Sequence, residues 1–466
     1  MIEIISSLKQ AKNTQWVFLV TNRFDFEKYV PYGLWEKVLK KVEDIFIKQK
    51  NTTLKIFLGR DDFEEIVFFF YLDATQDIFV FLGEQIPSLS DNITFSYHQD
   101  NILFDSIILW KYQYDTYKTE KKEVHLSIEC PEISLVSLEE RYKTLECILD
   151  CRDLVNKPSN DKTPDKYVQH IKNMKFRNVK VKVIDYEEIK RLWLWLLEAV
   201  GKASTSKPKL VILEKIVDKK LPTFWIVGKG ITFDTGWLNI KVWDGMYGMK
   251  DDMAWSAAAL YMMKNLDEKK LNFNLVCALP IAENSIAWDA YRPWDILKSY
   301  SGKTVEVTNT DAEWRLVLAD GMSYLSKNYN LENITTIATL TGACMMALWY
   351  RYAWVMGNNT EMIEKLTANQ TFEKYWQLPY DDYFISKTSG TISDYVNYTG
   401  SVMAGAVMWW AFLSQFCLKW EKFTHIDIAG PSMIKEKYWV FNVWATGFWV
   451  EGLSYMYQNY GKISQR

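Results

Sequence analysis

Residues 224–233 read FWIVGKGITF, and they set the pattern for the larger part of the chain. An apolar run suited to a buried strand ends in Gly-Lys-Gly, where the glycines allow backbone to approach a ligand. Strands that alternate with helical segments predict a largely parallel sheet, with ligands bound beyond the strand ends. Similar apolar runs, each suited to a strand, recur in VKVKVIDY (179–186), KLVILEK (209–215), NFNLVCALPIAE (272–283), ITTIATLTG (334–342) and FTHIDIAG (423–430).

The beginning of the chain has a different pattern. Residues 34–50 (LWEKVLKKVEDIFIKQK) have helical periodicity, whereas 65–72 (EIVFFFYL) and 77–83 (DIFVFLG) are short β-rich runs. These patterns predict a small α/β domain, and no cluster of residues in it indicates chemistry.

A chain of 466 residues is too long for one ordinary core, so two domains are expected. Two helix patterns in 137–175 are separated by the breaker sequence NKPSNDKTP (156–164). We therefore predict an N-terminal α/β domain (1–135), a linker helix region (136–175) and a larger α/β domain (176–466). The larger domain should hold a central mixed, largely parallel sheet flanked by helices.

The charge balance indicates neither a nucleic-acid nor a membrane partner. The formal net charge is −3, from 55 basic and 58 acidic residues. The six cysteines form no ladder of short spacings, as expected for reduced thiols. The N-terminus lacks a basic start with an apolar run, and no stretch approaches the roughly 18 apolar residues of a membrane span. We expect a cytoplasmic protein.

Three segments carry polar residues that could do chemistry: VGKGITFDTGWLNIK (227–241), GMKDDMAWSAAA (248–259) and NTDAEWRL (309–316). Residues two apart in an extended strand point the same way, so Asp311 and Glu313 are expected to face a common cation. Arg315 would lie on that side too and offer a planar fork to an anion. Taken alone, this string also fits a solvated surface strand with alternating charges.

Three further residues favour the interpretation as a metal site. Lys229 and Asp234 follow the apolar strand, and Asp252 lies at the start of an apolar helix rich in small residues. Several converging buried acids call for a metal. No His or Cys accompanies them, which argues for an open two-cation catalytic site rather than a closed zinc site. His425 is expected to be a hydrogen-bonded structural residue instead of a ligand.

These segments resemble the leucine aminopeptidase family of dizinc cytosol aminopeptidases. The resemblance runs from about residue 140 to the C-terminus, and NTDAE-x-RL is the family signature. Other matching segments are LLEAVGKAS (196–204), AEN (282–284), AYRP (290–293), SGKTVEV (301–307), ATLTGAC (338–344), HIDIAGP (425–431) and ATGF (445–448).

The resemblance assigns a role to each residue of the cluster. Asp234 and Glu313 would contact both ions, Lys241 would polarise the scissile carbonyl, and Arg315 would hold a bicarbonate ion that acts as general base. The implied metal ligands are Lys229, Asp234, Asp252, Asp311 and Glu313.

The resemblance implies an aminopeptidase with two divalent metal ions, Zn or Mn. One ion would bind the free α-amino group of a peptide, and a metal-bridging hydroxide would attack the carbonyl. A homohexamer with enclosed active sites and a preference for apolar N-terminal residues such as leucine are also implied.

Two other functions stay open. One is a non-catalytic DNA-binding or scaffold relative, which the near-neutral charge does not support. The other is a different two-metal hydrolase that acts on phosphoesters or non-peptide amides. The seven retained site residues argue against lost catalysis.

The sequence departs from the family mainly in one way, with tryptophan where the family has glycine. Glycine is scarce, at 20 residues, and tryptophan is abundant, at 21. Thirteen tryptophans stand where glycine is expected: Trp193, Trp195, Trp237, Trp243, Trp255, Trp288, Trp294, Trp314, Trp349, Trp354, Trp439, Trp444 and Trp449.

An indole suits neither a positive φ nor a close backbone approach, the two usual reasons for glycine. Thirteen such changes would exceed a typical stability of about 5 to 15 kcal/mol. The codon UGA is read as glycine in some bacterial lineages and as tryptophan in others. We hypothesise that these residues are glycine in the organism, which would restore the usual glycine share of about 7%. As written, the chain is expected to fold poorly or to have a blocked site.

Overall fold

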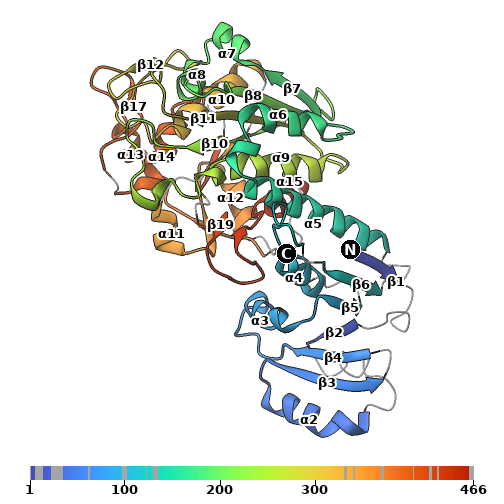
Figure 1. The fold of residues 1–466 in the computed structure, drawn as a ribbon. Helices are drawn as coiled ribbons and strands as arrows, with labels where there is room; N and C mark the ends of the chain where they lie inside the picture. The colour runs from blue at the N-terminus through green and yellow to red at the C-terminus, as the bar shows by residue number, and fades with distance from the viewer. Residues whose placement is uncertain are drawn as a thin grey trace. The chain divides into compact units, whose positions relative to one another are not determined.

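The computed structural model describes residues 2–5, 14–21, 35–60, 63–96, 102–121, 123–129, 135–329, 333–338, 342–368, 372–401, 403–418, 422–427 and 430–460. The chain divides into two compact units, which Figure 1 colours by residue number. The first consists of Met1–Glu146 with Lys435–Val443, and the second of Cys147–Ile434 with Trp444–Arg466.

The first unit contains a six-stranded sheet in the order β1-β6-β5-β2-β4-β3. Its strand pairs are parallel except β3 with β4, which is antiparallel. Aromatic side chains such as Trp16, Phe18, Phe68 and Phe70 fill its core. The elements are β1 Ile2–Ile5, β2 Thr14–Val20, α2 Trp35–Lys48, β3 Thr52–Arg60, β4 Phe63–Phe70, α3 Ile78–Gln85, β5 Asn92–Ser96, α4 Ile102–Lys111 and β6 His125–Glu129.

The helix predicted at 34–50 and the strand predicted at 65–72 are confirmed by α2 and β4, but the β-rich run at 77–83 is wrong. It forms the helix α3. Asp77 begins this helix, because its carboxylate accepts a hydrogen bond from the Phe79 N–H at 2.9 Å. A short apolar run has no period that separates a buried strand from a buried helix, so the cap decides between them.

The second unit contains a nine-stranded sheet in the order β16-β15-β18-β14-β9-β11-β8-β7, with β10 paired to β11. Strands β11, β9, β14 and β18 run parallel at its centre, whereas β7, β8 and β15 enter antiparallel pairs. The predicted mixed, largely parallel sheet is therefore confirmed. The strands are β7 Lys180–Ile184, β8 Lys209–Lys215, β9 Thr223–Gly228, β10 Gly230–Asp234, β11 Asn274–Asn284, β14 Asn333–Ala338, β15 Tyr352–Gly357, β16 Lys374–Gln377 and β18 Lys422–Asp427.

Helices cover both faces of this sheet (Figure 1). A Cβ at Gly228 would meet main-chain atoms of α9 within 3.1 Å, whereas a Cβ at Gly321 in α10 would meet Val227 at 2.9 Å. Neighbouring strand residues face opposite sides, so α9 and α10 lie on opposite faces. The helices of this unit are α6 Pro164–Asn173, α7 Tyr186–Leu192, α8 Trp195–Gly201, α9 Ala254–Leu266, α10 Trp314–Asn328, α11 Gly342–Leu348, α12 Thr360–Thr367, α13 Tyr383–Ser386, α14 Gly405–Ser414 and α15 Val450–Asn459, while α5 Leu135–Asn156 begins in the first unit and ends in the second.

The left-handed backbone region contains an unusual residue type in this chain. Ten non-glycine residues among those described have a positive φ, and besides Gln49 and Ala404 all of them are tryptophans. Positive φ places Cβ against the neighbouring carbonyl and costs roughly 1–2 kcal/mol per residue. The eight tryptophans are Trp193, Trp237, Trp243, Trp294, Trp349, Trp439, Trp444 and Trp449, and each belongs to the thirteen that stand at expected glycines.

Among the described residues, no helix has the length and apolar character that a membrane crossing requires. Cys147, Cys151, Cys277 and Cys417 are not in disulfides. The side chains of Cys130 and Cys344 lie outside the described part of the chain.

Candidate active site

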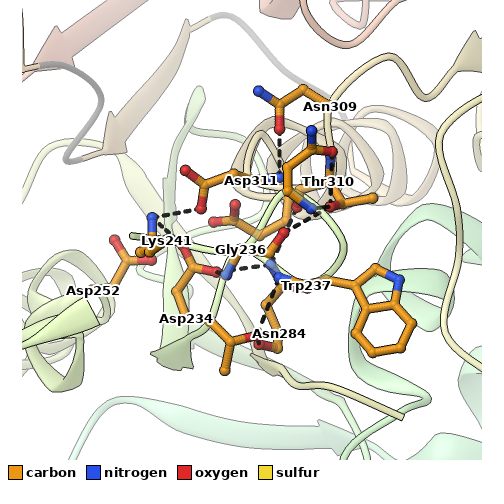
Figure 2. A network of polar contacts seen from close by, with 12 residues as sticks. Asp234, Gly236, Trp237, Lys241, Asp252, Asn284, Asn309, Thr310 and Asp311 are labelled. Atoms are coloured by element: carbon orange, nitrogen blue, oxygen red, sulfur yellow. Dashed lines mark hydrogen bonds and ion pairs between the residues drawn. The ribbon is translucent and has the colours of Figure 1, made fainter. Parts of the chain in front are cut away.

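Strand ends and helix starts in the second unit bring the candidate site residues together. The run at 224–233 is two strands, β9 and β10, and Lys229 lies between them. Asp234 ends β10, while Asp252 lies two residues before the start of α9. Figure 2 shows Asp234, Asp252, Asp311 and Lys241 converging from these separate segments.

Two lysines are ion-paired within this cluster. Lys229 Nζ lies 2.5 Å from Asp252 Oδ1 and 3.2 Å from Glu313 Oε1. Lys241 Nζ lies 3.0 Å from Asp234 Oδ2 and 2.5 Å from Asp311 Oδ1. Four carboxylates thus share two ammonium groups, which leaves two formal negative charges in a largely buried place.

Burial and mutual repulsion shift the pKa values of these acids upward. Burial, with repulsion from Asp234, raises the pKa of Glu313 to about 8, against the attraction of Lys229. Burial likewise raises the pKa of Asp252 to about 6, and the pKa of Asp311 is raised for the same reason. Burial alone would lower the pKa of Lys229, but Asp252 and Glu313 outweigh it and raise that pKa. These shifts indicate that the cluster has fewer positive charges than its carboxylates need.

The arrangement fits divalent cations. Asp234, Asp252 and Glu313 each offer a carboxylate oxygen, and these oxygens lie within 4.8 Å of one another. Glu313 Oε2 is buried and accepts no hydrogen bond from the described residues. A buried carboxylate oxygen without a donor is costly unless a cation meets it, and an all-oxygen group with a lysine suits an open site. Asp311 adjoins this group through Lys241.

The extended strand predicted across Asp311, Glu313 and Arg315 is wrong. Asp311 lies in a turn, where its N–H donates to Asn309 Oδ1 at 2.8 Å, and Glu313 has φ −72° and ψ −36° at the start of α10. Trp314 and Arg315 are already helical. The apolar residues that follow recur at helical spacing and extend the helix back to the signature segment.

The Arg315 guanidinium is held by aromatic rings and a main-chain oxygen. Its guanidinium carbon is 3.3 Å from the ring centre of Trp409 and 4.7 Å from that of Trp314, and Nη1 donates to the main-chain oxygen of Asn397. The cavity beside it measures about 10 Å³, room for about one water. In the chain as written, this cavity is too small for bicarbonate.

The Trp237 side chain does not enter the space between the carboxylates. It has φ 53°, its indole N–H donates to the main-chain oxygen of Tyr291, and the ring points away from the carboxylates in Figure 2. His425 is hydrogen-bonded through Nδ1 to Thr336 Oγ1 at 2.7 Å, as predicted, and is not part of the cation group.

Sequence reasoning missed the uncharged residues that hold these ligands. Asn284, at the end of β11, donates from Nδ2 to Asp234 Oδ1 at 2.7 Å. Thr310 contacts Gly236 and Asn239 through its hydroxyl. A single asparagine after a strand gives no signal of this role. Only the position of AEN at the end of an apolar run could have indicated it.

The fold and the cluster together define a metal-dependent α/β enzyme. A model of the cytosol aminopeptidase family, catalytic domain, matches residues 150–454. "Probable cytosol aminopeptidase 1" of Shewanella oneidensis is 36% identical over 360 residues, which are 76% of this chain and 71% of that protein. A relative from Aquifex aeolicus is 35% identical over 356 residues, covering 74% of this chain and 71% of its own length.

Solved structures share the fold. The cytosol aminopeptidase of Coxiella burnetii aligns with a TM-score of 0.83 at 24% identity, covering 98% of this chain and 99% of that one. The bottromycin maturation enzyme BotP in complex with Mn aligns with a TM-score of 0.80 at 22% identity, covering 95% and 98%. This chain belongs to the cytosol aminopeptidase family, whose members are metal-dependent, and it is a leucyl aminopeptidase-like exopeptidase.

Proposed function

We propose that this chain removes N-terminal residues, preferring apolar ones such as leucine, from peptides with a free amino terminus. The observation that carries the proposal is the group of four carboxylates and two lysines with two uncompensated negative charges. Two divalent cations, Zn²⁺ or Mn²⁺, would more than offset that charge at the ends of the central strands.

The proposed ligands divide by burial. Lys229, Asp234, Asp252 and Glu313 form the buried part, and Asp311 lies at the more open edge with 31% of its side chain exposed. Lys229 must release its proton before its nitrogen can bind a cation. When bound, the two cations supply Lewis-acid activation of a shared water and of the scissile carbonyl.

Lys241 is proposed to stabilise the negative charge that develops on the carbonyl oxygen. Its side chain is 16% exposed and stands at the same open edge as Asp311, so a peptide arriving there would meet its ammonium group. The carboxylates of Asp234, Glu313 and Asp311 outweigh burial and raise the pKa of Lys241, which keeps it charged. Because the cavity beside Arg315 is too small for bicarbonate in the written chain, no proton transfer is assigned to that anion.

We also propose a homohexamer in the cytoplasm, without a nucleic-acid partner. The loop that carries Lys241 exposes several apolar side chains, which supports self-association through this surface. These are Leu238 (54% exposed), Val242 (64%) and Tyr247 (81%).

Hydrolysis of leucine arylamide by full-length protein with added Mn²⁺ or Zn²⁺ tests the proposal. The protein is prepared as written and as a glycine form, which carries glycine at the thirteen tryptophan positions. Cleavage of leucine arylamide but not of N-acetyl-leucine arylamide is expected, and chelator should abolish it. A folded, metal-loaded protein that cleaves neither substrate would favour a scaffold, and one that cleaves only phosphoesters would favour the other hydrolase.

A further inference from the structure

Asn284 lies buried at the end of β11, beside Asp234. Its Nδ2 donates to Asp234 Oδ1 at 2.7 Å and to the main-chain oxygen of Thr310 at 3.2 Å. Both neighbours are acceptors, so only the amino half of the Asn284 amide can face them. One side-chain group therefore joins two segments that carry proposed cation ligands (Figure 2).

The contact with Asp234 decides which oxygen that residue can offer. Oδ1 also accepts the Gly236 N–H at 2.9 Å, so two donors already occupy it. Oδ2 faces the cluster, 3.0 Å from Lys241 Nζ. A carboxylate fixed by two hydrogen bonds at one oxygen presents the other in a single direction.

The contact with Thr310 extends this restraint to the turn before α10. The Thr310 carbonyl also accepts the Tyr291 hydroxyl at 2.7 Å, and Thr310 directly precedes Asp311. The Thr310 hydroxyl donates to the Gly236 carbonyl at 2.7 Å. The segments that end in Asp234 and begin with Asp311 are thus held to each other on both sides.

We propose that Asn284 is a positioning residue that fixes Asp234 Oδ2 and the Asp311 turn in the geometry that cation binding requires. The proposal rests on the proposed two-cation function. Asn284 acts through Asp234 and Thr310, and it is assigned no contact with substrate.

The test is a titration with Mn²⁺, measured by calorimetry, of three variants made in the full-length glycine form. Asn284→Ala removes both hydrogen bonds, and Asn284→Ser is a milder change in case the first does not fold. Asn274→Ala is the matched control, because Asn274 is a buried asparagine at the opposite end of the same strand. Its amide donates to the carbonyls of Asp218 and Leu221, far from the cluster in sequence.

Asn284→Ala is expected to weaken Mn²⁺ binding at one or both sites by about 10- to 100-fold, the usual effect of removing a group that orients a ligand. Asn284→Ser should fall between Asn284→Ala and the parent. Asn274→Ala should lower the unfolding temperature but leave Mn²⁺ affinity unchanged. Parent-like affinity in both Asn284 variants would overturn the inference, whereas a parent that binds no cation would instead overturn the proposed function.

A second inference rests on a separate observation, the positive φ of eight tryptophans. Trp193 follows the last residue of α7 and has φ 63°. Its main-chain N–H donates to the carbonyls of Ile189 and Lys190, and the Leu194 N–H also donates to the Ile189 carbonyl. Glycine normally occupies such a helix end. Trp449 has φ 93° before α15, although its indole is fully buried and its indole N–H has no partner among the described residues.

We infer that these eight residues are glycine in the organism's own protein. The other five of the thirteen have an ordinary backbone in the structure, so their assignment rests on the sequence. The gene tests the inference directly: UGA at the eight positions supports it, and UGG there overturns it.

Stability provides an independent test with a matched pair of exposed indoles. Trp349 is 56% exposed with φ 56°, and Trp376 is 59% exposed in the strand β16 with an ordinary backbone. Trp349→Gly should raise the unfolding temperature of the written chain, since strain is relieved and little burial is lost. Trp376→Gly should lower it, because glycine weakens a strand. An equal fall in unfolding temperature in both variants would contradict the inference.

Discussion

Lys229 Nζ lies 2.5 Å from Asp252 Oδ1, and both side chains are buried. Each needs the other in the metal-free chain, because a buried charge without a partner is strongly destabilising. A cation at this place would have to replace the lysine proton. The pair is therefore both a structural contact and a proposed half of a cation site.

Lys229→Arg should separate these two roles. Arginine keeps a positive charge beside Asp252 but cannot be deprotonated, so it cannot bind a cation. We expect the bound Mn²⁺ to fall from about two to about one per chain and kcat to fall by more than about 100-fold. Lys215→Arg is the control, since buried Lys215 only donates to carbonyls near the end of α9. Two bound cations in Lys229→Arg would contradict the ligand assignment.

The metal-free protein should lose stability as the pH rises. The folded pKa values of Glu313, about 8, and Asp252, about 6, exceed the usual unfolded values of about 4.3 and 3.9. The folded state then binds more protons than the unfolded state between about pH 4 and pH 8, and the stability that these protons provide is lost as the pH rises through that window.

Urea unfolding of metal-free parent and Glu313→Gln at several pH values measures this effect. Asp320 and Glu373 have raised pKa values of the same sign, so the difference between parent and variant isolates Glu313. The slope of the unfolding free energy against pH should be smaller in Glu313→Gln than in the parent. With saturating Mn²⁺ the parent slope should flatten, because the cation binds the deprotonated carboxylate. An identical slope in both proteins would contradict the raised pKa of Glu313.

Lys241→Gln should impair catalysis while it leaves cation binding intact. Removing one donor to a developing oxyanion typically costs about 10²- to 10³-fold in kcat. KM should change little, because the interaction strengthens only in the transition state. Stopped assays with parallel metal analysis measure both quantities. Loss of cations in this variant would assign Lys241 to the metal site instead.

Trp314→Gly should reopen the space beside Arg315. The Trp314 ring centre lies 4.7 Å from the guanidinium carbon of Arg315, so removing the ring uncovers one side of the guanidinium group. Bicarbonate added to carbon dioxide-free buffer should then raise kcat by about 10-fold or more, as expected for a general base. The comparison is the glycine form with tryptophan kept at 314, which should not respond. An equal response in both would show that Trp314 does not block the anion.

The sequence predicted the sheet and the acid cluster because both depend on residue type in a simple pattern. The apolar runs at 209–215 and 224–233 favoured buried strands, and Asp234, directly after the second run, indicated a cation site. It missed the turn at Asp311, since alternation in three residues cannot separate a strand from a helix start. It also missed α3, where one cap at Asp77 decides the structure.

Contacts between distant segments had no local signal. Asn284 meets Thr310 only after the sheet has formed, and residues 435–443 belong to the first unit although they lie between two parts of the second in sequence. The tryptophans behave differently: their excess was visible in the composition, and the structure adds the positive φ at eight of them.

The most direct test of the central claim is a titration of the metal-free glycine form with Mn²⁺, with bound metal and leucine arylamide hydrolysis measured on the same samples. We predict that about two cations bind per chain, that activity follows the second, and that Glu313→Gln loses both binding and activity. Full activity with one cation or none, or in Glu313→Gln, would contradict a two-cation aminopeptidase site.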